Sequence, residues 1–264
     1  MIDSEAILSN QMKDSKNRRG LIVTLILSLV ANVVFLAVSV YVIGTKTKFF
    51  QRMEVRLGLK EQKEQKEQDP QARGDYWCIQ GWTNTLKKLG YDADVVFFGN
   101  SITSGGNFQN YFPDKKTCNL GYPGDGMVGM ALRVEQVKAV NPEKVFVMTG
   151  INGSRGRDND VFESQYQRMV DTLKKVVPNA EVYLQSILPV NYGKTKAYAS
   201  IEEIKSANEI IKKIAQRSNC IYVDLWTLYE NEGEMPQELT RDGVHLIPEA
   251  YDRWVEEIRK YIEE

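Results

Sequence analysis

The chain has 264 residues, of which 42% are hydrophobic and 26% are charged. Its 34 Lys and Arg residues nearly balance its 35 Asp and Glu residues, so the charge gives no reason to expect a nucleic-acid partner. Three cysteines without a paired CxxC spacing indicate neither a disulfide framework nor a zinc site. The length allows one sizeable domain with an appendage.

After a polar tail over residues 1–20, residues 21–44 are apolar and carry no charge. A helix of this length measures about 36 Å, against a hydrocarbon core of about 30 Å. We therefore expect a transmembrane helix that acts as an uncleaved signal anchor. A cleaved signal peptide is the alternative, although Ala37-Val38-Ser39 is a poor cleavage site.

Four basic residues lie close to each end of this apolar segment, so the positive-inside rule leaves its orientation undecided. A large domain that follows a single span can translocate regardless of local charge. We therefore expect a single-pass protein of the plasma membrane with its C-terminal domain outside the cytoplasm. Residues 45–72 include the repeat KEQKEQKEQ and are expected to form a charged stalk, and residues 73–264 a single domain.

Five short apolar runs within that domain predict strands, and the segments between them have helical periodicity. The runs are 94–98, 117–120, 144–148, 181–184 with 187–188, and 220–225. Strands that are apolar on both faces and alternate with amphipathic helices are typical of a parallel sheet between two helical layers. We therefore predict a three-layer α/β/α domain, in which ligands bind at the carboxyl ends of the strands.

Four polar motifs follow predicted elements at that edge: Ser101 in GNSIT, Gly124 in NLGYPGDG, Asn152 in TGING, and Asp242 with His245 in DGVHL. Taken singly, the first three fit a helix cap or an ordinary turn at least as well as a catalytic group. The last motif holds the only histidine of the chain, three residues after a carboxylate that can orient its imidazole. That pairing favours a catalytic role.

In this order, the four motifs resemble the sequence blocks of the SGNH (GDSL-type) esterase, lipase and acylhydrolase family, over about residues 94–262. The resemblance implies Ser101 as nucleophile, His245 as general base and Asp242 as its partner. It implies an oxyanion hole formed by the backbone amides of Ser101 and Gly124 and the side chain of Asn152. It also implies a five-stranded parallel sheet in the flavodoxin-like order 2-1-3-4-5, and no metal or organic cofactor.

Two positions depart from the family pattern. Asn100 stands where the family usually has Asp, and Gly153 where it usually has Asp or Asn. Neither residue is assigned to proton transfer, so we expect effects on loop geometry and specificity more than on reaction type. The implied strand order also puts Cys118 and Cys220 at opposite edges of the sheet, so a disulfide between them is not expected.

These features predict a membrane-anchored serine esterase that cleaves short acyl esters, with O-acetyl groups of envelope glycans or lipids as candidate substrates. Its expected partners are the acyl ester and the membrane, through residues 21–44. Arg155 and Asn191 are candidate substrate-binding residues; Arg155 and Arg157 either face an anionic substrate group or are solvated. An O-acyltransferase with the same triad, or an inactive glycan-binding or scaffold domain, are the alternatives.

Overall fold

The structure is a computed structural model that describes residues 28–29, 32, 34, 76–152 and 155–263. The chain divides into two compact units, residues 1–65 and 66–264. The predicted tail, the predicted stalk and all but four residues of the predicted membrane segment lie outside the described residues. Within the described ranges, no helix combines the length and apolar character needed to cross a bilayer.

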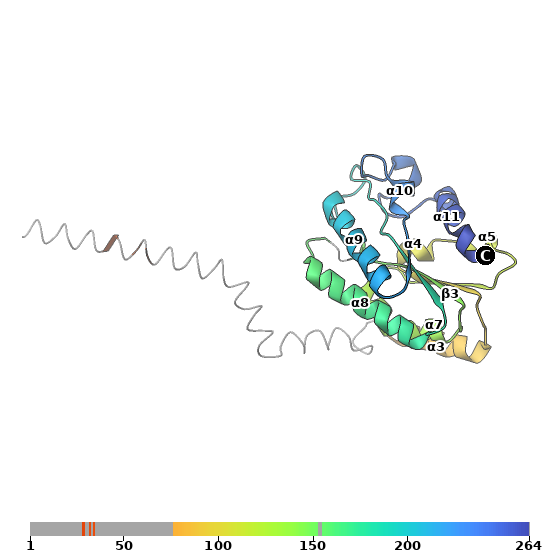
Figure 1. The fold of residues 1–264 in the computed structure, drawn as a ribbon. Helices are drawn as coiled ribbons and strands as arrows, with labels where there is room; N and C mark the ends of the chain where they lie inside the picture. The colour runs from red at the N-terminus through yellow and green to blue at the C-terminus, as the bar shows by residue number, and fades with distance from the viewer. Residues whose placement is uncertain (1–27, 30–31, 33, 35–75, 153–154, 264) are drawn as a thin grey trace, which may run out of the picture. The chain divides into compact units, whose positions relative to one another are not determined.

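The second unit is built on a five-stranded sheet in the order β2-β1-β3-β4-β5, in which all neighbouring strands are parallel (Figure 1). The strands are β1 (Val95–Gly99), β2 (Thr117–Gly121), β3 (Lys144–Met148), β4 (Glu181–Gln185) and β5 (Ile221–Val223). The five predicted strands and the order implied by the resemblance are confirmed, except that β4 ends at Gln185 and residues 187–188 lie outside it. All five residues of β1 are buried, as a central strand covered on both faces requires.

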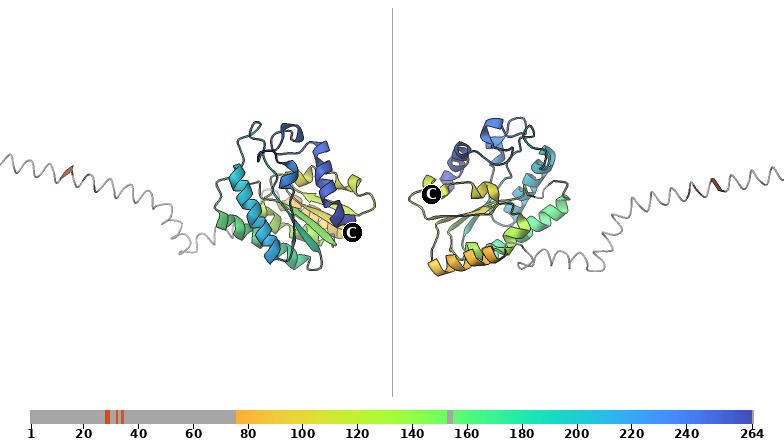
Figure 2. Two further views of the ribbon diagram at one scale, coloured as in Figure 1. Left: turned by 45° about the horizontal axis from the view of Figure 1, so that its top comes forward. Right: turned by 180° about the vertical axis from the view of Figure 1, so that it is seen from behind.

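Helices cover both faces of the sheet (Figures 1 and 2). In chain order they are α3 (Tyr76–Leu89), α4 (Ser101–Ser104), α5 (Phe108–Tyr111), α6 (Met127–Leu132), α7 (Val134–Lys138), α8 (Asn159–Val176), α9 (Ile201–Arg217), α10 (Trp226–Tyr229) and α11 (Tyr251–Glu263), with short 3-10 turns η2 (Gln237–Leu239) and η3 (Pro248–Ala250). The predicted three-layer α/β/α architecture is therefore confirmed for the described part of the second unit.

One face of the sheet is held by a row of aromatic rings. Phe97, Phe146 and Tyr183 lie opposite one another on three neighbouring strands, with ring centroids 5.5 and 4.4 Å apart. Phe108 of α5 stacks on Phe97 at 3.7 Å, and Tyr261 of α11 lies 5.1 Å from Tyr183. Aromatic pairs at these distances add to the burial of apolar area. This packing fixes the central strands against α5 and α11.

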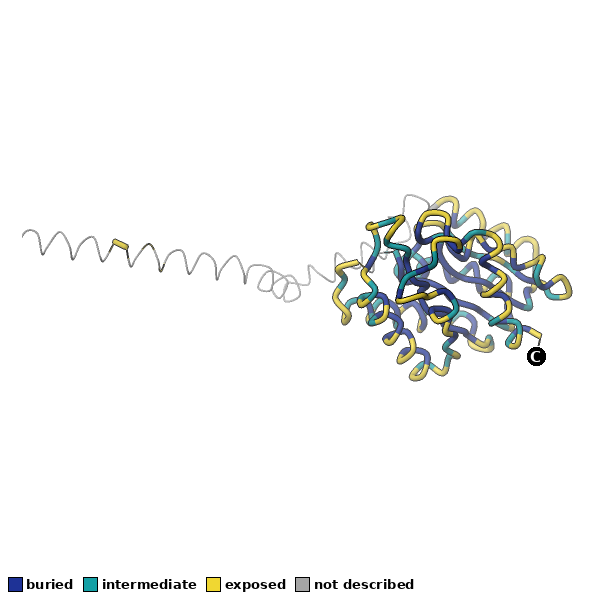
Figure 3. Tube along the Cα trace, turned by 90° about the horizontal axis from the view of Figure 1, so that it is seen from above, coloured by how far each residue is buried: buried dark blue, intermediate teal, exposed yellow. Residues whose placement is uncertain are grey.

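Burial follows the layers, with the sheet in the interior and the outer sides of the helices exposed (Figure 3). Cys118 lies in β2 and Cys220 directly precedes β5, and these strands are the two edges of the sheet. Both thiols and that of Cys78 are free. The expectation that Cys118 and Cys220 do not form a disulfide is confirmed.

Candidate active site

Ser101 is presented by a sharp turn at the end of β1. A Cβ atom on Gly99 would lie 2.1 Å from the hydroxyl oxygen of Thr103, so only glycine permits this turn. Asn100 follows, and its side-chain oxygen accepts a hydrogen bond of 2.9 Å from the backbone N–H of Ile102. Asn100 thus caps the short helix that begins with Ser101. An Asp at this position could accept the same hydrogen bond, so the effect of the departure on loop geometry and specificity stays a prediction.

Asp242 and His245 share a tight turn between η2 and η3. The glycine between them, Gly243, has a φ of +99°, a left-handed conformation that other residues rarely adopt. One carboxylate oxygen of Asp242 accepts the backbone N–H groups of Val244 (3.1 Å) and His245 (2.9 Å). The other oxygen lies 2.7 Å from Nδ1 of His245. The carboxylate therefore fixes both the turn and the orientation of the imidazole.

The structure brings this turn to Ser101 across 144 positions of sequence: Nε2 of His245 lies 2.9 Å from Oγ of Ser101. Burial alone would raise the pKa of Asp242, but the hydrogen bonds from the backbone and the ring of His245, and from Val244, outweigh it and lower the pKa to about 2. The ionised carboxylate of Asp242 accepts a hydrogen bond from an N–H at Nδ1 of His245, which leaves Nε2 free to accept the hydroxyl proton.

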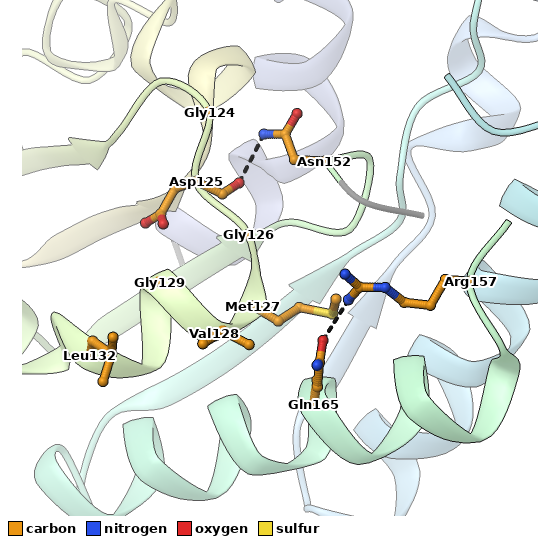
Figure 4. Close-up of a pocket in the computed structure, with 10 residues that line it drawn as sticks. All are labelled: Gly124, Asp125, Gly126, Met127, Val128, Gly129, Leu132, Asn152, Arg157 and Gln165. Carbon is orange, nitrogen blue, oxygen red and sulfur yellow. Dashed lines mark hydrogen bonds between the residues drawn. The ribbon is translucent and has the colours of Figure 1, made fainter. Parts of the chain in front are cut away.

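Gly124 and Asn152 line the same cavity, and the side chain of Asn152 points toward the loop that carries Gly124 (Figure 4). Gly124 has a φ of +76° in the loop after β2, and Asn152 follows β3. The side-chain nitrogen of Asn152 donates to the backbone oxygen of Asp125 at 2.8 Å, which fixes the orientation of its amide. An amide nitrogen has two N–H groups. Gly153, the second departure from the family pattern, lies outside the described residues.

A cavity of about 460 Å³ extends from Gly124 and Asn152. Met127, Val128 and Leu132 of α6 supply apolar side chains to its wall. Arg157 and Gln165 complete the lining, and their side chains are hydrogen-bonded to each other (Figure 4). The cavity is therefore apolar along one wall and polar at the other.

The remaining candidate residues lie elsewhere. Arg155 is exposed and reaches the backbone oxygen of Ala197 at 3.5 Å, and it does not line this cavity. Asn191 donates from its side chain to the backbone oxygen of Met235 at 2.7 Å, and its backbone N–H donates to Gly243. Asn191 thus braces the turn of Asp242 and His245. Substrate contact by Arg155 or Asn191 stays a prediction.

Sequence reasoning missed a buried ion pair behind Gly124. Nε of Arg133 lies 2.5 Å from Oδ2 of Asp125, and both side chains are almost fully buried. The signal in the sequence is a single arginine between the apolar residues of α6 and Val134. It could have identified a buried cation, but not its partners.

Comparison with known proteins identifies the family of the chain. The family model for GDSL-like lipases and acylhydrolases matches residues 97–253. The chain is similar to the acetyl xylan esterase AlAXEase, with 27% identity and a TM-score of 0.53 over 63% of this chain and 98% of that one. No match was found among curated proteins.

Two further solved structures support the fold. One is a GDSL-like lipase from Bacteroides thetaiotaomicron, with 23% identity and a TM-score of 0.60 over 70% of this chain and 97% of that one. The other is a variant of Axe2, an acetyl xylan esterase from Geobacillus stearothermophilus, with 20% identity and a TM-score of 0.52 over 66% and 95%.

The fold, the site and these matches together define a carboxylic ester hydrolase. The family match covers more than half of the chain, which therefore belongs to the GDSL-like lipase/acylhydrolase family.

Proposed function

We propose that this esterase works through a covalent acyl-enzyme formed on Ser101. The observation that carries the proposal is the continuous series of contacts from Asp242 to His245 (2.7 Å) and from His245 to Ser101 (2.9 Å). A nucleophile within hydrogen-bond reach of a base, which is itself oriented by a third group, is the signature of nucleophilic catalysis. This assembled series favours an active enzyme over a glycan-binding or scaffold domain.

In the first half-reaction, Oγ of Ser101 attacks the ester carbonyl while its proton moves to Nε2 of His245. The carbonyl electron pair moves onto oxygen. When the tetrahedral intermediate collapses, the ester C–O bond breaks and Nε2 gives its proton to the departing alcohol. In the second half-reaction, water gives a proton to Nε2 and attacks the acyl carbon. The C–Oγ bond breaks, the proton returns to Ser101, and the carboxylic acid leaves.

The negative charge of both tetrahedral intermediates would be stabilised by three donors: the backbone N–H groups of Ser101 and Gly124 and the side-chain amide of Asn152. Such donors are worth most when they are oriented before the reaction begins. The contact of Asn152 with the backbone of Asp125 supports this role, because it holds the amide without using both of its N–H groups.

The cavity beyond Gly124 and Asn152 suits the acyl group of the ester. His245 protonates the leaving oxygen, so the alcohol must lie on the side of His245. The lining of the cavity comes instead from the loop after β2, from α6, from Asn152 and Arg157, and from Gln165 of α8. Its far wall holds the polar groups of Arg157 and Gln165, which a long alkyl chain would have to desolvate. A short acyl group avoids that penalty.

We infer that the substrates are short-chain acyl esters, with O-acetyl groups of envelope glycans or lipids as the leading class. The likeness to an acetyl xylan esterase at 27% identity supports an acetylated carbohydrate. The uncharged segment 21–44 supports attachment to the plasma membrane as a single-pass anchor, with the esterase domain outside the cytoplasm. Anchoring would hold the site near envelope polymers.

The test uses the full-length chain in mild detergent with p-nitrophenyl acetate, butyrate and octanoate. We expect the acetate and butyrate to be hydrolysed fastest, and all turnover to disappear in Ser101→Ala. Ser104→Ala is the matched control, because Ser104 ends the same short helix, is exposed, and should leave the rates unchanged. Equal rates in the Ser101 and Ser104 variants would contradict the proposal, and fastest turnover of octanoate would contradict the short-chain preference.

A further inference from the structure

Arg133 lies between α6 and α7, behind the loop that carries Gly124, and it is among the largest fully buried side chains of the described residues. The side chains of Arg133 and its ion-pair partner Asp125 are only 1% and 2% exposed. Removing two charges from water carries a large penalty, which is offset only when the geometry is good and further hydrogen bonds satisfy the remaining donors. The remaining contacts of the guanidinium therefore indicate what it holds.

Those contacts join the ends of two neighbouring strands. Nη2 of Arg133 donates to the backbone oxygen of Gly99, the last residue of β1, at 2.7 Å. Nη1 donates to the backbone oxygen of Leu120 near the end of β2, also at 2.7 Å. The guanidinium carbon lies 4.4 Å from the centre of the Phe98 ring, close enough for a cation–π contact. A planar group with five N–H donors is suited to holding several acceptors at fixed angles.

Two of the contacts of Arg133, with Gly99 and with Asp125, lead to the proposed oxyanion donors. Ser101 lies two residues after Gly99. Gly124 is the neighbour of Asp125, whose carboxylate is held by the guanidinium. Asn152 donates to the backbone oxygen of the same Asp125. One buried cation is thus connected to all three donors, through one or two residues of chain or through one further hydrogen bond.

We propose that Arg133 is a positioning residue of the oxyanion hole. It touches neither the ester nor the nucleophile, and it acts through Asp125 and Gly99 on the relative places of the three donors. The inference rests on the proposed function of this site. Donors must lie about 2.7–3.1 Å from the developing oxyanion, and a displacement of about 1 Å can lower a rate on the order of a hundredfold.

Arg133→Lys tests this role because it keeps the charge beside Asp125 and removes the planar fork that reaches Gly99 and Leu120. For p-nitrophenyl acetate we expect kcat and kcat/KM to fall together, on the order of ten- to a hundredfold, and KM to change less than about twofold. The acid limb of the pH profile should not move, because the contacts of His245 are intact. Leu173→Ala, a buried change near the end of α8, is the control for general destabilisation.

A double-mutant cycle separates positioning from a general effect on folding. If Arg133 acts through the oxyanion donors, its replacement should matter little once one donor is gone. In an Asn152→Ala background we therefore expect Arg133→Lys to lower kcat by less than about threefold. If Arg133→Lys does not fold, Asp125→Asn replaces it in the cycle, because it keeps the shape of the side chain and removes its charge. We expect it also to lower kcat by less than about threefold in the Asn152→Ala background. The Leu173 variant should instead have the same effect in both backgrounds.

Three outcomes would overturn the inference. A folded Arg133→Lys protein with the kcat of the wild type would overturn it. So would a double variant in which Arg133→Lys lowers kcat by the same factor with and without Asn152→Ala. Loss of cooperative unfolding in both the Arg133 and Asp125 variants would make the pair a requirement for folding instead. If the wild type shows no turnover that depends on Ser101, both the proposed function and this inference are overturned. If that turnover is present but Arg133→Lys does not change kcat, only this inference is overturned.

Discussion

Two carboxylates near this site pair with basic side chains in opposite surroundings, one with an imidazole and one with a guanidinium. Asp242 and His245 are three residues apart in one turn, and their side chains are 43% and 28% exposed. Asp125 and Arg133 are almost fully buried and hold the ends of two strands. In the first pair, His245 takes up and releases a proton in each half-reaction while Asp242 orients its ring. In the second pair, the guanidinium of Arg133 keeps its charge at every working pH, because it does not lose its proton.

Asp242 and His245 thus serve proton transfer, whereas Asp125 and Arg133 fix the positions of the strand ends and of the loop after β2. Disrupting the first should change the ionisation or tautomer of the base, and so the pH dependence. Disrupting the second should change the stabilisation of the oxyanion, and so kcat at every pH. The changes to the first pair are expected to lower kcat most.

Asp242→Asn should have the largest effect. The amide no longer favours the tautomer in which Nδ1 carries the proton, and loss of this group in a serine triad lowers kcat on the order of 10⁴-fold. This loss of kcat is measured by steady-state kinetics with p-nitrophenyl acetate. Asp171→Asn is the control, since Asp171 is an exposed carboxylate on α8. A loss of less than about tenfold in the Asp242 variant would argue against its role as the partner of the base.

Asn152→Ala removes one proposed oxyanion donor and leaves the base untouched. Removal of one such donor typically lowers kcat by about 10²–10³. We expect a folded protein whose kcat falls by that amount while its pH profile is unchanged. Unchanged kcat in a folded variant would remove Asn152 from the oxyanion hole, and a shifted pH profile would place its effect on the base instead.

The pH dependence of the wild type should have one acid limb. The pKa of Asp242 is lowered to about 2, so this carboxylate stays ionised above about pH 4. A loss of activity between pH 8 and pH 5 therefore does not come from Asp242, and a general base that works only in its unprotonated form produces an acid limb. We expect kcat/KM to fall with a limiting slope of about one decade per pH unit. A flat profile over this range would contradict a histidine base.

The smallest effect concerns stability. The folded pKa of Asp242 lies below its ordinary value of 3.8, so ionisation stabilises the folded state above that value, and this stabilisation is lost as the pH falls towards 2. Because the side chain is 43% exposed, solvent screening keeps the effect small. Urea unfolding at pH 5, 4 and 3 should show the wild type losing its advantage over Asp242→Asn. A constant difference would contradict the low pKa.

The sequence predicted the sheet because its central strands are apolar on both faces, and polar motifs follow the first three strands. The register of Phe97, Phe146 and Tyr183 across three strands shows why such runs are dependable signals. Asp242 and His245 could be paired because their contact is local, within one turn. Ser101 and Asn152 were joined to them only by the resemblance to a family, since no spacing indicates a contact across 144 residues.

The other features of the site depend on contacts between distant parts of the chain, which no local sequence pattern indicates. Arg133 is one charge in an apolar segment, and its partners come from the ends of β1 and β2 and from the loop after β2. Arg155 and Asn191 lie in polar loops, and such loops do not say where a side chain points. Asn191 proved to bind backbone near the turn of His245. The long-range geometry of the site is thus the part that required a structure.

The central claim, an activated serine at position 101, is tested most directly by covalent labelling. The full-length chain in mild detergent is treated with a fluorophosphonate, and intact mass is measured for the wild type, Ser101→Ala, His245→Ala and Ser104→Ala. We expect one adduct on the wild type and on the Ser104 variant, none on the Ser101 variant, and much slower labelling of the His245 variant. A folded wild type that takes up no adduct, or a Ser101 variant labelled at the wild-type rate, would contradict it.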